Sequence, residues 1–242
     1  MKKIDAHAHM RVGHPGSWRN FSITPQELIC QMDEYEIEKT VICTLPNEET
    51  QKAVNEFPDR LIGTVWVNPH EGKKAVAQIY DYITHHNFKG IKLQPLAHAF
   101  VANEPIVYPI AQAAENLNVP LFIHCGHPPY SLPWSIAQLA EAFPKIKIVM
   151  VHMGHGHGVY IQASIDMAKK YPNLYLETSG MPMHTKIQEA YEQVGANRVL
   201  FGTDIPLHHP SVEIQKILVS GLNKSQLEDV FYNNIKKLLN LA

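Results

Sequence analysis

Short runs of apolar, β-branched residues alternate along the chain with longer stretches in which apolar and polar positions are mixed. The short runs are typical of buried strands, and the longer stretches have the three- and four-residue spacing of amphipathic helices. The pattern predicts eight strands, at Ile4–His9, Thr40–Leu45, Leu61–Val67, Gly90–Gln94, Pro120–Cys125, Lys147–His152, Asn173–Thr178 and Arg198–Asp204.

The stretches between the predicted strands contain helix signals. One helix is predicted to begin at Thr24, because Thr24 is followed by Pro25 and Glu27, the pattern of an N-cap with a capping-box partner. Further helices are predicted at Lys73–His86, Glu104–Asn116, Ser135–Phe143, Ala163–Lys170, Lys186–Val194, Ser211–Ser220 and Ser225–Leu241.

Strands that alternate with helices form parallel βαβ units. Eight repetitions favour an α/β fold of the (β/α)8 TIM-barrel type. The main competitor is an open, doubly wound sheet, but no Gly-x-Gly-x-x-Gly pattern follows the first predicted strand. We find no long linker or internal repeat, so we expect residues 1–242 to form a single barrel domain.

Composition narrows the partners that we expect. The 242 residues are 45% apolar and 18% charged, with a net charge of −2, which is an ordinary globular mix without a basic surplus. We therefore expect no nucleic acid and no membrane among the partners. Neither a signal peptide nor an apolar run near 18 residues is visible, so a cytoplasmic protein is expected. A homo-oligomer is the default expectation for such a protein.

Cysteine use argues against a disulfide framework. The three cysteines, Cys30, Cys43 and Cys125, are far apart and form no Cys-x-x-Cys pair. A cysteine zinc knuckle is disfavoured for the same reason.

Polar side chains gather at the ends of the predicted strands. His7 and His9 share one face of the first strand, because side chains two residues apart point to the same side. TIM-barrel active sites lie at the C-terminal ends of the strands. Chance could produce one such pair in a chain with 15 histidines, but it would scatter further candidates over helices and loops. Instead, four further residues fall at the same ends: Lys92, His124, His152 and Asp204.

With these motifs the chain resembles the amidohydrolase superfamily. It is most similar to the amidohydrolase-2 branch, which includes aminocarboxymuconate-semialdehyde decarboxylase-like enzymes and pyrone-dicarboxylate lactonases. A His-x-His motif alone is a weak signal, but the ordered set on successive strands is specific. The matching motifs are Asp5-Ala-His7-Ala-His9, Gly90-Ile-Lys92-Leu93, Ile123-His124-Cys125-Gly126, Val151-His152-Met153-Gly154, Gly202-Thr203-Asp204-Ile205-Pro206 and the closing helix from Tyr232 to Leu239.

The resemblance implies a metal site. By it, His7, His9, His124 and Asp204 bind a divalent metal, with Zn²⁺ expected, and one or two ions remain possible. Three imidazoles and a carboxylate suit zinc with an open position for water, whose pKa the metal lowers. Asp204 is the expected catalytic proton carrier, and His152 is either a catalytic residue or a ligand of a second metal. Simpler interpretations are a turn residue for Asp204 and satisfied buried histidines for His124 and His152.

Lys92 has two uses that the sequence leaves open. Some binuclear relatives carry a carboxylated lysine at this place, bridging two metals; in others the lysine could bind a substrate carboxylate. A buried amine is easily shifted in pKa, which permits both uses. Relatives often follow this lysine with Leu-His-Pro, whereas this chain has Gln94 at the histidine position, so no role of that histidine is carried over to this chain.

Substrate contacts are expected from the loops after the strands. Arg11 and Lys92 are the candidate cations for a substrate carboxylate, and His155 lies in a glycine-rich loop after the sixth strand. Trp134 could form an apolar wall with Trp18, Phe21 and Tyr130, or pack on the surface. Glu177 is either near the site or structural. Further loop histidines that could line a pocket are His14, His98, His127, His157, His184, His208 and His209.

The leading functional hypothesis is a metal-dependent hydrolase that acts on an amide, lactone or ester-like bond of a small organic acid. The alternative is a lyase, a zinc-dependent non-oxidative decarboxylase of an aromatic or unsaturated carboxylic acid, which uses much the same ligands. A third interpretation is a metal-binding protein without turnover. The presence of both Asp204 and His152 counts against it, because binding alone needs no proton carrier.

Overall fold

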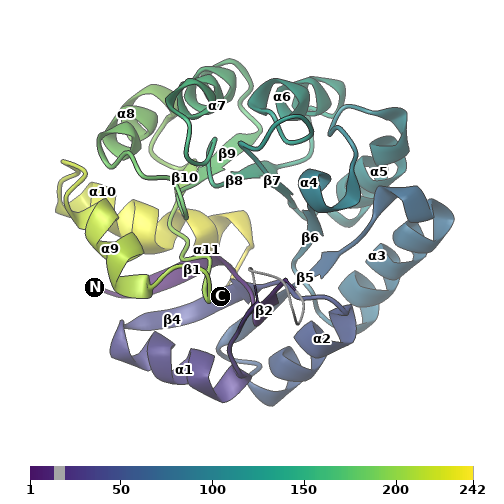
Figure 1. Ribbon diagram of the computed structural model, residues 1–242, viewed down its shortest axis with the longest axis horizontal. Helices are drawn as coiled ribbons and strands as arrows, with labels where there is room; N and C mark the ends of the chain where they lie inside the picture. Colours follow the sequence, from purple (N-terminus) through teal and green to yellow (C-terminus); the bar gives the residue numbers. More distant parts are fainter. Residues whose placement is uncertain (14–19, 242) are drawn as a thin grey trace.

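Eight parallel strands lie side by side in chain order and form a barrel, seen end-on in Figure 1. This computed structural model describes residues 1–13 and 20–241. The predicted (β/α)8 architecture is confirmed. The barrel strands are β1 (Lys3–Ala8), β4 (Ile37–Ile42), β5 (Leu61–Trp66), β6 (Gly90–Leu93), β7 (Leu121–His124), β8 (Ile148–Val151), β9 (Leu174–Glu177) and β10 (Val199–Leu200).

The barrel is closed between β1 and the segment that follows β10. The amide of Ala6 donates to the carbonyl of Phe201 at 2.9 Å, and the amide of Asp204 donates to the carbonyl of His7 at 2.8 Å. The last predicted strand, Arg198–Asp204, is thus in the right place but longer than the regular ladder. The ladder stops at Leu200, and the backbone turns into the left-handed region at Asp204, whose φ is 57°.

A buried carboxylate joins the two edges of this closure. Asp5 Oδ1 accepts from the backbone amide of Thr203 at 2.9 Å and from that of His7 at 3.0 Å. Asp5 Oδ2 accepts from the hydroxyl of Thr203 at 2.5 Å. Burial raises the pKa of Asp5 to about 7. Three donors therefore depend on one side chain at the point where the first and last strands meet.

Helices cover the outside of the barrel (Figure 1). The helix predicted at Thr24 is confirmed, because the Thr24 side chain accepts from the amide of Glu27 and the Glu27 carboxylate accepts from the amide of Thr24. The helices are α1 (Pro25–Glu34), α2 (Asn47–Glu56), α3 (Lys73–His85), α4 (Pro95–His98), α5 (Tyr108–Leu117), α6 (Pro133–Ala142), α7 (Gly158–Lys170), α8 (Thr185–Val194), α9 (Pro210–Leu218), α10 (Lys224–Glu228) and α11 (Asn234–Leu238), with short turns η1 (Pro69–Glu71), η2 (Pro105–Val107) and η3 (Asp229–Asn233).

Several elements differ from the pattern-based prediction. The short helix α4 and the hairpin of β2 (Arg11–Val12) and β3 (Phe21–Ser22) were not predicted, and α7 begins at Gly158 rather than at Ala163. Helix α2 was not predicted, because few of its residues are apolar and it buries only Asn47, Thr50 and Ala53. The closing helix, predicted as one element over Ser225–Leu241, consists of three consecutive segments, since the π-type turn η3 interrupts the α-helical hydrogen bonding.

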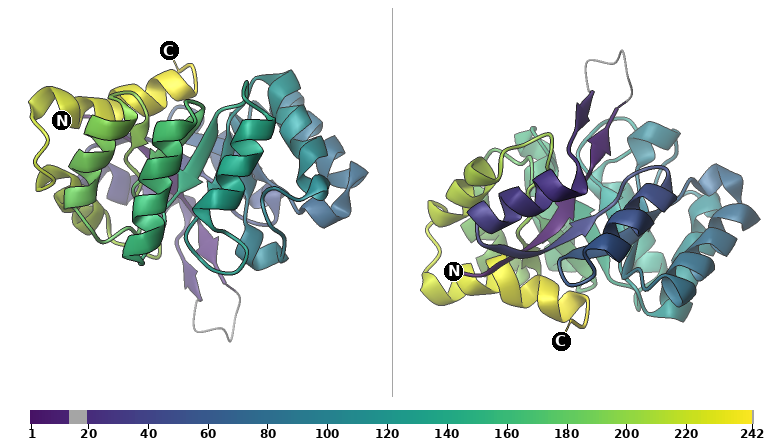
Figure 2. Two further views of the ribbon diagram at one scale, coloured as in Figure 1. Left: turned by 90° about the horizontal axis from the view of Figure 1, so that it is seen from above. Right: turned by 90° about the horizontal axis from the view of Figure 1, so that it is seen from below.

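One end of the barrel is filled with apolar side chains. Ile4, Ala6 and Leu200 belong to an internal cluster that also contains Ile235 and Leu238 from α11. The two-stranded hairpin β2 (Arg11–Val12) and β3 (Phe21–Ser22) projects from the opposite end, as Figure 2 shows. The apolar end therefore stabilises the barrel, and the C-terminal ends of the strands are left for polar side chains.

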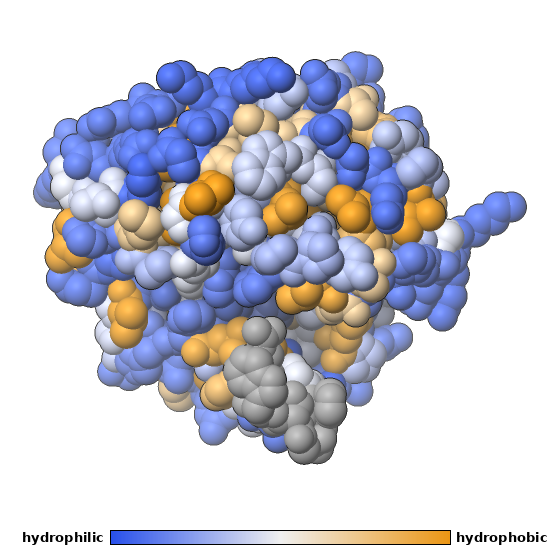
Figure 3. Space-filling view, turned by 45° about the horizontal axis from the view of Figure 1, so that its top comes forward, coloured by the Kyte–Doolittle hydropathy of each residue, from blue (hydrophilic) through white to orange (hydrophobic). Residues whose placement is uncertain are grey.

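The face of the molecule shown in Figure 3 is mostly hydrophilic. On the face shown in Figure 3, apolar side chains form small separate patches between polar ones. Across the described residues, none of the helices combines the length and the apolar character that crossing a membrane requires.

Candidate active site

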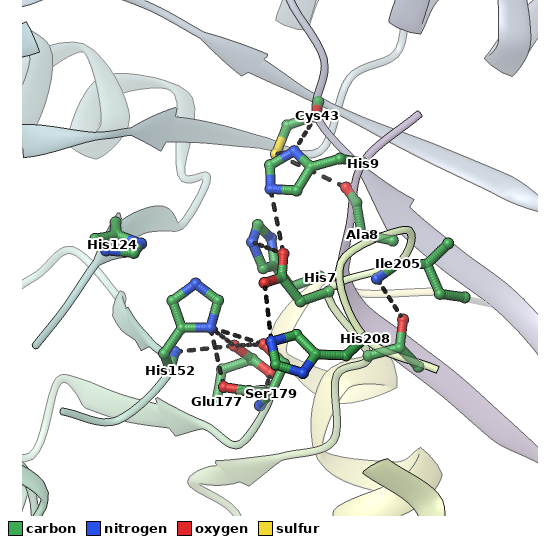
Figure 4. Close-up of polar contacts among 12 residues, drawn as sticks. His7, Ala8, His9, Cys43, His124, His152, Glu177, Ser179, Ile205 and His208 are labelled. Carbon is green, nitrogen blue, oxygen red and sulfur yellow. Dashed lines mark hydrogen bonds and ion pairs between the residues drawn. The ribbon is translucent and has the colours of Figure 1, made fainter. Parts of the chain in front are cut away.

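The structure brings His7, His9 and Asp204 together at the C-terminal ends of the strands. Figure 4 shows the two histidines with His152. The Nε2 atoms of His7 and His9 lie 3.6 and 3.5 Å from Asp204 Oδ1. The ring of His152 lies beside them, with its centroid 5.3 Å from that of His7. Strand geometry explains the pair, because His7 and His9 are two residues apart at the end of β1.

Two buried atoms of this group lack hydrogen-bond partners. His7 is 2% exposed and Asp204 3%, yet neither His7 Nε2 nor Asp204 Oδ1 has a hydrogen-bond partner among the described residues. Buried polar atoms without partners are rare and cost about 1–3 kcal/mol each. The ligand atoms of His7, His152 and Asp204 lie within 4.8 Å of one another. Imidazole and carboxylate donors suit a divalent transition metal, so the residues present fit such an ion.

A second compact donor group contains a residue that the sequence did not suggest. The ligand atoms of His7, His9 and Cys43 also lie within 4.8 Å of one another. Cys43 directly follows β4, so the strand-end argument could have found it. Burial raises the pKa of its thiol to about 12, which keeps it protonated near neutral pH.

His124 lies next to the site but outside both compact groups. Its Nε2 is 2.7 Å from Nδ1 of His127, and its ring centroid is 4.8 Å from that of His152. The Nε2 atom that a metal would use is thus engaged with another histidine. The role of His124 as a metal ligand therefore stays a prediction.

Hydrogen bonds at Nδ1 fix the orientation of two histidine rings. His9 Nδ1 is 2.5 Å from the carbonyl oxygen of Cys43, and His152 Nδ1 is 2.9 Å from the carbonyl oxygen of Ser179. A carbonyl oxygen only accepts, so each Nδ1 carries the proton and each Nε2 keeps a free lone pair. This is the tautomer that a metal or a substrate proton requires.

Glu177 supports the loop that carries His152. This fully buried carboxylate accepts from the amide of His152 at 3.0 Å, from the amide of Ser179 at 2.5 Å and from the hydroxyl of Ser179 at 2.8 Å. Burial raises its pKa to about 7. The backbone of His152 is held in the left-handed region, at a φ of 70°. The sequence left open whether Glu177 lies near the site or is only structural. Its contacts with His152 and Ser179 make it a positioning residue beside the site.

Lys92 is buried near the group, only 1% exposed. Its Nζ atom has no hydrogen-bond partner among the described residues, and burial lowers its pKa. Neither the bridging use nor the carboxylate-binding use is tested by this arrangement, so both stay predictions.

A cavity of about 540 Å³ opens above these side chains. Of the predicted substrate contacts, His155 and Arg11 line it, and so do Phe21 and His208. The guanidinium of Arg11 already donates to Glu49 and to the carbonyl of Leu45, each at 2.9 Å. His98 and His127 also line the cavity, whereas His14 and Trp18 lie outside the described residues.

Trp134 is not brought into the site. It lies on α6 with 42% of its surface exposed, its ring contacts Tyr160 with centroids 6.1 Å apart, and it does not line the cavity. The sequence missed Trp66, which ends β5 and does line the cavity. Trp66 stands at a strand end, as the other site residues do, but an indole is neither a metal ligand nor a proton carrier, so its position gave no signal.

Burial of the histidines predicts acid sensitivity of the metal-free protein. Burial lowers the pKa of His9 from 6.5 to about 3, so between these values the unfolded chain binds a proton that the folded protein does not. The free energy of unfolding therefore decreases as the pH falls below about 6.5. The decrease due to His9 is up to about 2 kcal/mol between pH 6.5 and 5. Asp5 and Glu177 have raised pKa values, so their protonation favours the folded protein as the pH falls, opposite to the effect of His9.

The measurement is the difference between two proteins. Urea unfolding is measured at pH 7 and pH 5 after chelation. The decrease in the free energy of unfolding between the two pH values should be smaller for His9→Asn than for the wild type. Equal losses in the two proteins would contradict the prediction.

A parallel eight-stranded barrel with a buried histidine–carboxylate group under a cavity defines the class of TIM-barrel enzymes that use a divalent metal. The chain belongs to the amidohydrolase family, because the family model described as "Amidohydrolase" matches residues 4–241. The resemblance seen in the sequence is thereby confirmed at the level of the family.

The relatives include aromatic-acid decarboxylases. A gamma-resorcylate decarboxylase from a Polaromonas species is 22% identical, over 80% of this chain and 77% of that protein. The 5-carboxyvanillate decarboxylase of Sphingomonas paucimobilis superposes with a TM-score of 0.81 at 15% identity, covering 100% of this chain and 99% of that one. The Novosphingobium aromaticivorans enzyme, complexed with manganese and 4-hydroxy-3-methoxy-5-nitrobenzoic acid, gives 0.81 at 16% identity, covering 99% and 96%. At these identities the structural matches establish the shared fold.

Proposed function

We propose that the protein is a metal-dependent, non-oxidative decarboxylase of an aromatic carboxylic acid. The observation that carries the proposal is the buried, unpartnered Asp204 oxygen beside His7, at the floor of a cavity of about 540 Å³. That volume is within the range of small-molecule sites and accommodates a one-ring acid. The relatives support this reaction, which was the alternative from the sequence, better than the hydrolysis that the sequence favoured.

The bond that breaks joins the ring to the carboxylate carbon. Its electron pair stays on the ring carbon, which takes up a proton while CO₂ leaves, so one proton is consumed per turnover. A divalent ion held by His7, His9 and Asp204, with His124 or His152 beside them, would supply positive charge that binds the acid and stabilises the developing negative charge. Zn²⁺ stays a prediction, and the nitrogen and oxygen donors accept Mn²⁺ as well.

Two side chains of this chain have assigned tasks in the proposed reaction. Asp204 lines the cavity and holds the proton that reaches the ring carbon. His152 also lines the cavity, and its ring, held at Nδ1 by Ser179, orients the substrate through Nε2. The supporting carboxylate of Glu177 keeps that ring in place.

The decisive experiment measures CO₂. Protein loaded with Zn²⁺ or Mn²⁺ is incubated with 2,6-dihydroxybenzoate in deuterated buffer, in parallel with lactone and ester substrates. We expect one CO₂ per molecule consumed, one deuterium on the product ring, loss of activity with a chelator and recovery on adding the metal. Turnover of a lactone without CO₂ would instead identify a hydrolase, and tight metal binding without turnover would favour the non-catalytic interpretation.

A further inference from the structure

A second cavity, of about 760 Å³, adjoins the one above the candidate metal ligands. We call it the outer cavity, and we call the cavity of about 540 Å³ the inner cavity. The outer cavity lies between α9 and the segment that leads from β9 into α8, on one side of the barrel in Figure 1. His208 lines both cavities, so its ring is part of the wall between them. The proposed reaction gives the outer cavity no task.

The wall between the two cavities is thin. Gly180 lines the outer cavity, and a Cβ at this position would lie 3.5 Å from His152 Nδ1 and 3.6 Å from His155 Nε2, on two residues that line the inner cavity. The same Cβ would lie 3.4 Å from His208 Nε2. Gly180 has a φ of 66°, a conformation that favours glycine, so the wall has no side chain here. At this place a glycine backbone and one imidazole ring separate the cavities.

The ring of His208 is not fixed by hydrogen bonds. Its Nε2 is 3.9 Å from Asp204 Oδ2 and its Nδ1 is 3.7 Å from Glu213 Oε1, and both distances are too long for a hydrogen bond. The side chain is 36% exposed. Exposed side chains change rotamer within picoseconds to nanoseconds. A rotamer change that moves this ring out of the wall therefore joins the two cavities.

Apolar side chains decide what the outer cavity can hold. Pro182, Val212 and Val219 line it, and Val212 is 60% exposed and Val219 50%. Among the described residues that line it, the lysine and the carboxylate, Lys216 and Glu213, are paired with each other. An occupant therefore gains free energy by burying apolar surface, whereas a charged occupant would be desolvated without a countercharge.

We propose that the outer cavity receives an apolar substituent of the substrate, carried by the ring whose carboxylate lies at the candidate metal ligands. The proposal rests on the proposed function for the aromatic acid, and the occupant follows from the continuity of the two cavities at His208. The substrate class is then an aromatic acid with an alkyl or aryl substituent. Val212 and His208 are specificity-determining residues.

Direct binding tests the proposal. The Mn²⁺-loaded protein is titrated calorimetrically with benzoate and with 2-, 3- and 4-butylbenzoate. We expect at least one butylbenzoate to bind about tenfold more tightly than benzoate, which is part of the roughly hundredfold that full burial of four carbon atoms provides. We call this ratio the butyl gain.

Two variants locate the butyl group. In Val212→Asp the butyl gain should fall to about twofold, because a carboxylate keeps water in the outer cavity, and benzoate affinity should stay within about twofold of the wild type. In His208→Ala the butyl gain should rise by about threefold, because the ring no longer obstructs the passage between the cavities.

Val159→Asp is the matched control, because Val159 is 57% exposed, lies in the first turn of α7 as Val212 does in α9, and lines neither cavity. It should leave all four affinities unchanged. A carboxylate is favourable in the first turn of a helix, so both aspartate variants should fold. Thermal unfolding checks this for each variant.

Three results would overturn the proposal: no butylbenzoate shows the gain, a folded Val212→Asp protein keeps it, or His208→Ala lowers it. Sedimentation identifies one other occupant. If the wild type is an oligomer that Val212→Asp dissociates while the butyl gain is unchanged, the outer cavity is an interface between copies of this chain and the proposal is wrong.

CO₂ release from 2,6-dihydroxybenzoate, measured with the same proteins, separates this proposal from the proposed function. A butyl gain that Val212→Asp removes, without CO₂ release, supports the outer cavity and contradicts decarboxylation. CO₂ release without a butyl gain does the reverse.

Discussion

Replacing Asp204 with Asn should lower the rate of CO₂ release from the metal-loaded protein by about a thousandfold, in the range lost with a proton-transfer group. The carboxylate lines the cavity and lies within 3.6 Å of both His7 Nε2 and His9 Nε2. Asparagine keeps the size of the side chain, but it can neither hold nor deliver a proton. The effect should therefore appear in kcat, whereas each product molecule that does form still carries one deuterium.

Two controls make the Asp204→Asn result specific. Metal content is measured for each protein, because Asp204 is also a candidate ligand and a loss of metal would mimic a loss of proton transfer. Asp166→Asn makes the same change at an exposed aspartate of α7 and should leave the rate unchanged. A variant that keeps its metal and releases CO₂ within tenfold of the wild-type rate would contradict the role given to Asp204.

Gly202→Ala should lower the free energy of unfolding by about 3 kcal/mol, the upper end of the cost of overpacking. A Cβ at this position would lie 2.1 Å from Oε1 of Glu177. The carboxylate cannot move aside without losing the hydrogen bonds that it accepts from His152 and Ser179. The same change should weaken metal binding, since His152 would lose its support.

Urea unfolding of the metal-free proteins measures this cost. Gly156→Ala is the matched control, because a Cβ there meets nothing within 4 Å. Shortening the carboxylate in the double variant Gly202→Ala/Glu177→Asp should recover part of the lost stability. A Gly202→Ala protein within about 0.5 kcal/mol of the wild type, the usual scatter of surface substitutions, would show that Glu177 is not held as described.

The barrel was predictable because its strands are buried on both faces and therefore appear as continuous apolar runs. Helix α2 was not, since its polar sequence begins after Pro46 and is held in place by tertiary contacts such as that of Asn47 with Trp66. The extent of the last strand was also hidden, because the ladder of β10 stops at Leu200 and the segment after it bonds to β1, a long-range contact that leaves no local sequence signal.

The convergence of His7, His9, His152 and Asp204 was predictable, because it depends only on strand order and the barrel's geometry. The contact of His124 Nε2 with His127 was not, because the loop after β7 sets it. For Trp134 the sequence left open a place in the cavity wall or on the surface, and the surface alternative is the one found.

The junction at Asp5 has a consequence for how the protein is made. Its partner Thr203 lies 198 residues further along the chain. Almost the whole chain must therefore be synthesised before the Asp5 carboxylate can accept hydrogen bonds from Thr203. Contacts of such long range form late and slowly. His7 and Asp204 flank this junction, and pairing of the first and last strands therefore assembles the proposed metal ligands in the same event. A nascent chain that ends before the junction would have its histidines exposed and no centre in which to hold a metal.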